Sequence, residues 1–327
     1  MAQMKAVVAE GPGEPEVLRY VDATRPAPRG WEVLIEVEAA GVNYADTMRR
    51  RNRYLTRQSF PFTPGSEVAG TVVEVGEDVE NASEGDRVVT LLDSGGYADF
   101  AAVPAASLIP LPDGLGFDEA ATIPLQGLTA YHTIKTSGAL QEGEGVLVHA
   151  AAGGVGTLAV QMAKLLGAGR VIATAGSPEK LDLARSLGAD VLIDYTEEDW
   201  PEKVLEVTEG EGADVILEMV GADFPEKNLR CLATFGRMVV FGAASGDRGH
   251  LVPGALMNGC HSVVGFWLVP ILSRPDLFVP SLEQTLGWVA SGDLKLTIGA
   301  RYPLERAAEA HADLEGRKTT GKLILKP

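Results

Sequence analysis

The residues with the clearest chemical use form a glycine-rich run, 150–156, with the sequence Ala-Ala-Ala-Gly-Gly-Val-Gly. Gly153 would let the backbone approach a pyrophosphate, and Gly156 would let a helix pack closely on a strand. The first N–H groups of that helix would then face the phosphates. A single glycine-rich match also occurs in plain turns, but here a strand-like and a helix-like segment flank it. We therefore expect dinucleotide contacts from Ala152, Gly153, Gly154, Val155 and Gly156.

The next strand indicates which nicotinamide dinucleotide is used. Sites specific for NAD usually place an acidic side chain about 20 residues after the loop, on the ribose 2′-hydroxyl. This sequence instead has Thr174-Ala175-Gly176-Ser177, with no acid. Ser177 can donate to a 2′-phosphate, and Lys180 adds a cation one helical turn later. The pattern favours NADPH over NADH, although Lys180 is also consistent with a solvated helix residue.

The elements that position these residues alternate between strands and helices from residue 145 onward. Such alternation predicts parallel βαβ units and a doubly wound sheet, so the fold class is α/β. The expected strands are 146–150, 170–175, 191–194, 215–218, 238–241 and 262–268, and the expected helices include 157–166 and 178–187.

The first 125 residues are rich in short strand-like runs that are separated by glycine and proline turns. This pattern predicts a compact, β-rich, barrel-like unit. The expected strands are 33–38, 68–75, 87–92 and 97–103, and the tail ends in another strand, 322–325.

Length and composition limit the possible functions. The 327 residues indicate two domains, and 46% hydrophobic residues can build a sizeable core. The formal net charge of −17 disfavours binding to nucleic acid or to anionic membranes. Two cysteines, Cys231 and Cys260, cannot form a disulfide framework. We find no apolar run long enough to span a bilayer and no signal-peptide core, so we expect a cytoplasmic protein.

Taken together, these segments resemble the zinc-independent quinone oxidoreductases, relatives of zeta-crystallin within the medium-chain dehydrogenase/reductase superfamily. Besides the glycine loop, the landmarks of the resemblance are segments 39–43, 64–70, 85–88, 95–98, 126–131 and 320–322. The resemblance implies a GroES-like catalytic domain, residues 1–125 completed by residues 270–327. It also implies an NADPH-binding Rossmann domain, residues 126–269.

The same resemblance indicates whether the chain should bind zinc. Zinc-dependent relatives have a cysteine where Asn43 stands and a histidine where Ser66 stands. The turn 85–88 leads directly to Gly95 and leaves no room for a structural-zinc cysteine cluster. Catalytic zinc takes three protein ligands, mainly cysteine and histidine, and the five histidines are scattered. We therefore expect no metal. Electron-poor acceptors such as quinones and enones can take hydride without a Lewis acid.

The resemblance also assigns roles to single residues. It implies Asn43, Asp46 and Tyr54 as catalytic candidates: the Asn43 amide and the Tyr54 phenol could donate hydrogen bonds, while Asp46 would orient its neighbours. Asn43 could equally shape a turn, and Tyr54 could be a lid aromatic. Further cofactor contacts implied by the resemblance are Thr129, Tyr195, Phe241, Gly242, Phe266, Trp267, Leu268 and Lys322. The aromatic residues among them could equally be core.

A basic island lies next to Tyr54 in this acidic chain, at Arg49-Arg50-Arg51-Asn52-Arg53, followed by Arg57. The simpler interpretation is a solvated, salt-bridged helix end. The alternative is a site for an anionic substrate such as an acyl-CoA, because arginine forks suit phosphates.

These observations predict an NADPH-dependent oxidoreductase that transfers hydride to quinones or related conjugated carbonyls. Two alternatives remain open: an enoyl-thioester or enone double-bond reductase on the same fold, and a non-catalytic NADPH-binding protein. The apolar segment 262–268 is typical of an edge strand, and the resemblance implies a homodimer there.

Overall fold

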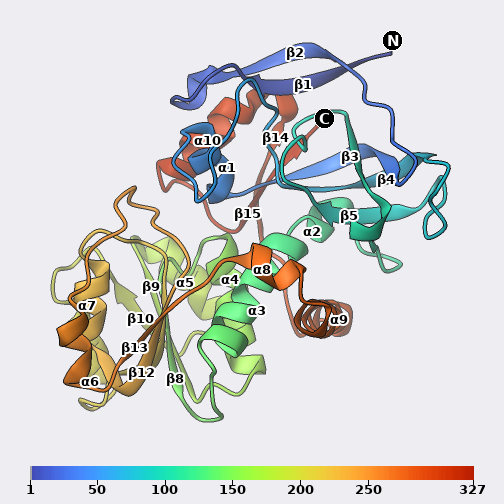
Figure 1. The fold of residues 1–327 in the computed structure, drawn as a ribbon. Coiled ribbons are helices and arrows are strands. Elements are labelled where there is room, and N and C mark those ends of the chain that lie inside the picture. The colour runs from blue at the N-terminus through green and yellow to red at the C-terminus, as the bar shows by residue number, and fades with distance from the viewer. Residues whose placement is uncertain (1) are drawn as a thin grey trace. The chain divides into compact units, whose positions relative to one another are not determined.

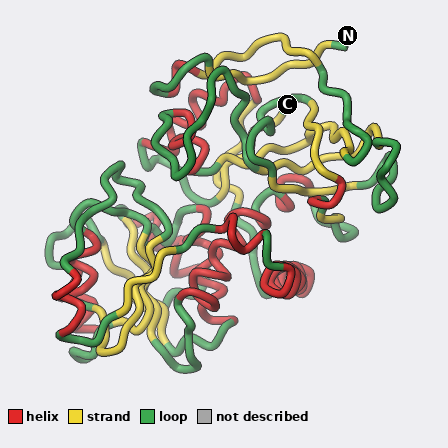
Figure 2. Tube along the Cα trace, viewed as in Figure 1, coloured by secondary structure: helices red, strands yellow, loops and turns green. Residues whose placement is uncertain are grey.

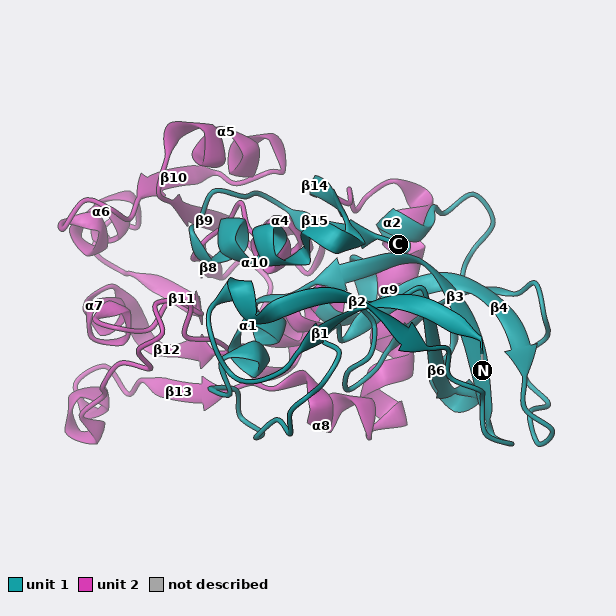
Figure 3. Ribbon diagram, turned by 90° about the horizontal axis from the view of Figure 1, so that it is seen from above, with its two compact units in different colours: residues 1–125, 297–327 teal, residues 126–296 magenta. Residues whose placement is uncertain are grey.

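Two compact units make up the computed structural model, which describes residues 2–327. Figure 3 colours them separately: unit 1 holds residues 1–125 and 297–327, and unit 2 holds residues 126–296. The sequence assigned 270–296 to the first domain, and that boundary is corrected here. Helix α9 (Pro275–Ser291) packs on helix α3 (Leu128–His132) of unit 2 because its polar residues bond to that helix.

Unit 1 is built on a seven-stranded, mostly antiparallel sheet in the order β14-β15-β3-β4-β5-β7, with β6 also paired to β3. A separate two-stranded ribbon joins β1 and β2. The strands are β1 (Gln3–Ala9), β2 (Leu18–Thr24), β3 (Glu32–Val42), β4 (Glu67–Val75), β5 (Arg87–Leu91), β6 (Phe100–Pro104), β7 (Ile109–Pro110), β14 (Ile298–Pro303) and β15 (Lys322–Lys326). The helices are α1 (Tyr44–Arg50), α2 (Phe117–Ala120) and α10 (Ala307–Glu315).

The long strand β3 leads directly into the first helix. Along β3 inward apolar residues alternate with Glu36 and Glu38, as expected for a strand with one buried face. The chain end returns beside β3, where Leu323 of β15 pairs with Val42. This register places Lys322 next to Asn43 at the start of α1.

Unit 2 is a parallel sheet in the order β10-β9-β8-β11-β12-β13, and every pair in it is parallel. Figures 1 and 2 show α3 and α4 on one face and α6 and α7 on the other. The strands are β8 (Gly145–Val148), β9 (Arg170–Ala175), β10 (Val191–Asp194), β11 (Ala213–Glu218), β12 (Leu232–Val240) and β13 (Ser262–Gly265). The further helices are α4 (Gly154–Leu165), α5 (Pro178–Ser186), α6 (Trp200–Val207), α7 (Phe224–Arg230) and α8 (Leu268–Leu272).

Each face of the parallel sheet has its own apolar core. Leu158 and Met162 of α4 pack on one face, and Trp200 and Val204 of α6 pack on the other. Burial on both faces explains why these strands are nearly continuous apolar runs. The predicted α/β class, with a β-rich domain and a doubly wound sheet, is confirmed.

Two predicted strands are shorter in the structure by two or more residues. Segment 262–268 is a strand only to Gly265, because Trp267 caps helix α8, which begins at Leu268. Segment 97–103 becomes a strand only at Phe100. Tyr97 instead lies in a turn, where its backbone N–H donates to the Pro64 carbonyl. Within residues 2–327, no helix has the length and apolarity needed to cross a bilayer.

Candidate active site

The glycine loop of unit 2 connects β8 to helix α4. A Cβ atom on Gly156 would lie 2.3 Å from the Ala150 carbonyl oxygen and 2.7 Å from Ala151 Cα, so only glycine fits there. A Cβ on Gly153 would meet nothing closer than 3.2 Å. Ala150 itself adopts φ of +48°, which turns the chain sharply after the strand. The helix therefore begins tightly against the strand, with first-turn N–H groups that have no intrahelical partner and can bind phosphate.

The second predicted cofactor patch lies where β9 and β10 end. Ser177 caps α5, since its hydroxyl accepts from the Lys180 amide at 3.4 Å. The ring of Tyr195 lies against Gly176, where an added Cβ would be 3.2 Å away. The structure thus brings Ser177, Lys180 and Tyr195 to one edge of the sheet. Glu179 adjoins them, and hydrogen bonds from its own amide and from Ser177 lower its carboxyl pKa.

The remaining predicted cofactor contacts of unit 2 lie on several different elements and do not form one cluster. Thr129 is buried in α3, and a Cβ on Gly242 would lie 3.1 Å from Met219 Cβ. The Phe266 ring stacks on His132, with centroids 6.4 Å apart. Phe241 packs against the core around α4, while Trp267 caps α8 and Leu268 is buried as its first residue. Phe266 and Trp267 therefore follow the edge strand and do not belong to it.

Sequence reasoning missed a buried polar network under this edge of the sheet. Glu218, the last residue of β11, accepts from the amides of Val220 and Gly221 at 2.6 and 2.7 Å and from Asn228 Nδ2 at 2.6 Å. His149 lies between Asn228 and a threonine of β9, bonded through both ring nitrogens. An acid at the carboxyl end of a buried strand was the available signal.

Burial shifts the proton affinity of both titratable groups in this network. It raises the pKa of Glu218 to about 7, against the lowering effect of its three donors. It lowers the pKa of His149 to about 4, so that imidazole is neutral at ordinary pH. The loop after β11 is thus fixed to the sheet by a carboxyl group that titrates near neutrality.

The catalytic candidates of unit 1 surround a buried ion pair. Lys322 Nζ is 2.8 Å from Asn43 Oδ1 and 2.5 Å from Glu67 Oε2, and all three side chains are buried. An ammonium only donates hydrogen bonds, so the Asn43 oxygen must face it. Asn43 Nδ2 then points to Glu67 Oε2 and the Gly41 carbonyl at the longer distances of 3.3 and 3.4 Å. Lys322, a predicted cofactor contact, thus lies within unit 1 with an exposure of 1%.

Asp46 lies beneath the start of α1. Its carboxylate accepts from the backbone N–H of Asn43 at 2.9 Å and from the Ser66 hydroxyl at 2.8 Å. Burial raises its pKa, and these two hydrogen bonds oppose the shift. The position fits the predicted orienting role. Tyr54 lies farther along the chain, with the Arg49 guanidinium 5.0 Å from its ring centroid.

Comparisons with known proteins agree with this arrangement. Residues 29–113 match the alcohol dehydrogenase GroES-like domain, and residues 154–280 match the family described as zinc-binding dehydrogenase. Quinone oxidoreductase of Pseudomonas aeruginosa is 38% identical over 96% of this chain and 97% of its own length. The chain belongs to the quinone oxidoreductase family.

Further relatives extend the match to nearly the whole chain. Human quinone oxidoreductase is 36% identical over 98% of this chain and 97% of its own length. Escherichia coli quinone oxidoreductase, solved in complex with NADPH, superposes with a TM-score of 0.93 at 35% identity and covers both chains fully. This quinone oxidoreductase homologue is therefore an oxidoreductase of the medium-chain dehydrogenase/reductase superfamily, as the sequence predicted.

The donor set of this family member does not fit zinc. Asn43 and Ser66, which stand at the ligand positions of zinc-dependent relatives, are bonded to Lys322 and Asp46 respectively. Over the described chain, 2–327, no three His, Cys, Asp or Glu side chains are grouped so as to hold a metal ion. Cys231 is buried and Cys260 lies apart from it, and both are free thiols.

Most of the basic island is used inside this quinone oxidoreductase homologue. Arg49 binds Asp93 at 2.8 Å, Arg50 is fully buried against Glu315, and Arg51 is paired as well. The helix end is salt-bridged, as the simpler interpretation predicted, but Arg49 and Arg50 are buried and not solvated. Arg53 and Arg57 are exposed.

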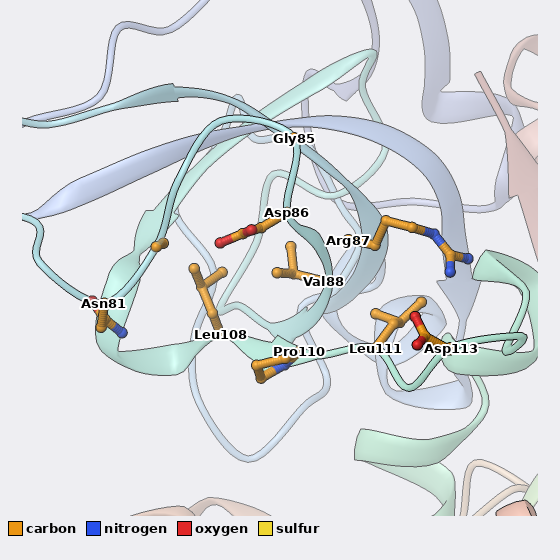
Figure 4. Close-up of a pocket in the computed structure, with 10 residues that line it drawn as sticks. Asn81, Gly85, Asp86, Arg87, Val88, Leu108, Pro110, Leu111 and Asp113 are labelled. Carbon is orange, nitrogen blue, oxygen red and sulfur yellow. The ribbon is translucent and has the colours of Figure 1, made fainter.

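A pocket of about 340 Å³ lies in unit 1, away from these candidates (Figure 4). Three of its polar side chains already have partners: Asn81 donates to the Ala105 carbonyl, Arg87 to the Leu115 carbonyl, and Asp86 accepts from an amide. None of the predicted site residues lines it. The pocket therefore adds nothing to the candidate active site.

Proposed function

We propose that this chain is an NADPH-dependent, zinc-independent reductase that transfers hydride to quinones or related conjugated carbonyls. The observation that carries the proposal is the buried Lys322–Glu67 ion pair, whose lysine also binds Asn43, a residue that the resemblance places at a zinc-ligand position. Family membership and the glycine loop supply the rest of the argument. A cytoplasmic location stays a prediction.

The cofactor half of the reaction depends on unit 2. NADPH, when bound, supplies the hydride. The amino end of α4 would bind the pyrophosphate, where Gly156 leaves no room for a side chain. Ser177 and Lys180 would bind the 2′-phosphate by a hydrogen bond and a charge, with Tyr195 beside them.

The acceptor half depends on unit 1. A quinone or enone gains negative charge on oxygen as hydride arrives, and hydrogen-bond donors can stabilise that charge. Asn43 and Tyr54 are the proposed donors. Asn43 Nδ2 would exchange one of its two long contacts, at 3.3 Å to Glu67 or 3.4 Å to the Gly41 carbonyl, for the acceptor oxygen. The Lys322 ammonium polarises the Asn43 amide by binding its oxygen, which makes the amide N–H groups better donors. The Lys322 ammonium would thereby assist hydride transfer through Asn43, without acting as a Lewis acid on the acceptor oxygen.

The first test measures initial rates of NADPH oxidation with a small quinone and, separately, with a short enoyl-CoA, with NADH as control. Faster quinone turnover that prefers NADPH is expected. A dominant enoyl-CoA rate would assign the chain to the double-bond reductases, with Arg53 and Arg57 as the exposed cations available to its phosphates. Tight NADPH binding without turnover of either acceptor would indicate a non-catalytic binding protein.

We also propose that the chain forms a homodimer through the edge strand β13. Among the described strands, β13 ends the six-stranded sheet and pairs only with β12. Two exposed apolar side chains flank this edge in the chain: Phe235 on the paired strand β12, at 69% exposure, and Met257 shortly before β13, at 79%. An edge of this kind is usually paired or protected, and a second copy would continue the sheet.

The dimer is tested by changing one residue on each edge of the same sheet. Val264→Glu on β13 should give a monomer in size-exclusion chromatography with light scattering. Val191→Glu on β10, at the opposite edge, is the matched control and should leave the mass unchanged. A dimer that survives Val264→Glu would exclude this interface.

A further inference from the structure

A buried chain of hydrogen bonds runs from Asp46 to the C-terminal helix of unit 1. The Tyr97 hydroxyl is 3.4 Å from Asp46 Oδ2 and 3.1 Å from His311 Nε2. His311 Nδ1 is 3.1 Å from Arg50 Nη1. All four side chains are buried, with exposures of 0%. The proposed reaction makes no use of Tyr97, His311 or Arg50.

The direction of these hydrogen bonds follows from the chemistry of arginine. A guanidinium has no acceptor, so His311 Nδ1 must accept from Arg50. The proton of the neutral imidazole is then on Nε2, which donates to the Tyr97 oxygen. The Tyr97 hydroxyl hydrogen is left to donate to Asp46. Burial, and then the charge of Arg50, lowers the pKa of His311 to about 3, which agrees with a neutral ring.

The far end of the chain is anchored on both sides of the guanidinium. Arg50 Nε donates to the Gly13 carbonyl at 3.0 Å, and Nη2 binds both carboxylate oxygens of Glu315 at 2.9 Å. Glu315 is the last residue of α10, and α10 contacts α1, as Figure 1 also shows. A permanently charged arginine at this end cannot release a proton at ordinary pH, so the chain cannot relay protons from the surface.

The near end determines where α1 begins. Asp46 is the third residue of α1, and its carboxylate holds the Asn43 amide and the Ser66 hydroxyl. Tyr97 is thus a third donor to a carboxylate that directly fixes Asn43. The charged groups that also face this region are Arg49 and Arg50 of α1, Glu67 of β4 and Lys322 of β15.

We propose that Tyr97 and His311 are positioning residues for the reductase site, which hold Asp46 and through it Asn43 in place. Helix α10, from the far end of the sequence, is thereby part of the catalytic apparatus. This inference rests on the proposed function only for the effect on turnover. The effect on the position of Asn43 stands on geometry alone.

The experiment compares two tyrosine-to-phenylalanine variants. Tyr97→Phe removes the donor to Asp46. Tyr302→Phe removes a similar donor, which binds the Asp313 carboxylate of the same helix α10 at 2.9 Å. We expect Tyr97→Phe to lower kcat about tenfold, with kcat expressed per NADPH-binding site, because a small misplacement of a catalytic group has effects of this size. NADPH affinity should be unchanged, and Tyr302→Phe should match the wild type in both.

A double variant asks whether Tyr97 acts through Asp46. Asp46→Asn with Tyr97→Phe should be no slower than Asp46→Asn alone, because residues that act through one another are not additive. An unchanged kcat in Tyr97→Phe would overturn the proposal. So would a further loss in the double variant, or an equal loss in Tyr302→Phe.

A second measurement does not depend on turnover. The backbone N–H of Asn43 donates to the Asp46 carboxylate. Hydrogen exchange of this N–H therefore reports whether the carboxylate is held in its position. Exchange at Asn43 should become about tenfold faster in Tyr97→Phe and in His311→Leu and stay unchanged in Tyr302→Phe. Unchanged protection of this N–H in Tyr97→Phe would overturn the proposal, whether or not the wild type reduces quinones. A wild type that reduces no quinone would refute only the proposed function.

Discussion

The candidate residues of unit 1 and those of unit 2 are stabilised in different ways. In unit 2 the site residues follow the ends of neighbouring parallel strands, and most of their chemistry is backbone geometry and local capping. In unit 1 the site is a set of buried side chains that bond across 279 residues of sequence, as Lys322 does with Asn43. A local site tolerates the loss of a side chain better than a buried ionic one, because no unpaired charge remains behind.

Breaking the ion pair of unit 1 should have the largest effect. Lys322→Met leaves Glu67 buried without its cation, and a broken buried pair costs about 4 kcal/mol of unfolding free energy. Denaturant unfolding measures this cost. Lys318→Met is the matched control, because Lys318 is exposed and its pairing with Asp313 at 3.5 Å should contribute well under about 1 kcal/mol. Equal stability of the two variants would remove the contrast between the two units.

The pH dependence of unit 2 should show the next largest effect. The folded protein raises the pKa of Glu218 to about 7 from a usual value of 4.5, so between these values the folded state holds a proton that the unfolded state has lost. The unfolding free energy therefore falls as the pH rises through this window, by about 3 kcal/mol, and is constant above it. Glu218→Gln lacks the titrating group and should lack this decrease.

Unfolding curves of the wild type and Glu218→Gln across this pH range isolate the contribution of Glu218, because the other titrating groups are common to both. If the two curves run parallel, Glu218 does not titrate in this window, and the pH dependence expected for the polar network of unit 2 is refuted.

The glycine loop should show a smaller effect on stability and a clear one on the cofactor. Gly156→Ala forces a methyl group against the Ala150 carbonyl and should cost about 2 kcal/mol and weaken NADPH binding at least about tenfold. Gly153→Ala, whose added Cβ would lie 3.2 Å from the Ala150 carbonyl oxygen, is the control for folding alone and should cost clearly less unfolding free energy than Gly156→Ala. Thermal unfolding compares the two variants, and fluorescence titration with NADPH measures the binding loss of Gly156→Ala. Equal unfolding free energies of the two variants would refute the close-packing argument.

The smallest expected effect sharpens the cofactor assignment. Lys180→Ala removes a partly exposed charge and should weaken NADPH binding about tenfold while leaving NADH nearly unchanged. Dissociation constants for both nucleotides decide the matter. An equal loss for both would mean that Lys180 does not bind the 2′-phosphate.

The same contrast explains which parts of the molecule could be predicted. The glycine loop and the start of α5 were found from spacing, because a strand, a tight turn and a helix follow one another within a few residues. The end of the edge strand was predicted three residues too late, because Phe266, Trp267 and Leu268 suit a strand and a buried helix start equally well.

Residues 270–296 were assigned to the wrong unit for a different reason. Helix α9 carries few signals beyond its apolar pattern, and its attachment to α3 depends on Gln284 and Ser281 meeting Tyr131 and His132. Those contacts join segments about 150 residues apart, and local spacing contains no information about them.

The sequence by itself determined the fold class, the family and the position of the glycine loop, because backbone turns and alternating elements are set by neighbouring residues. Only the tertiary structure decided that Lys322 is the buried partner of Asn43, and that His311 reaches Asp46 through Tyr97. A buried polar group must find its partner wherever the fold provides one. That partner can lie anywhere along the chain, so it is known only once the strands and helices have come together.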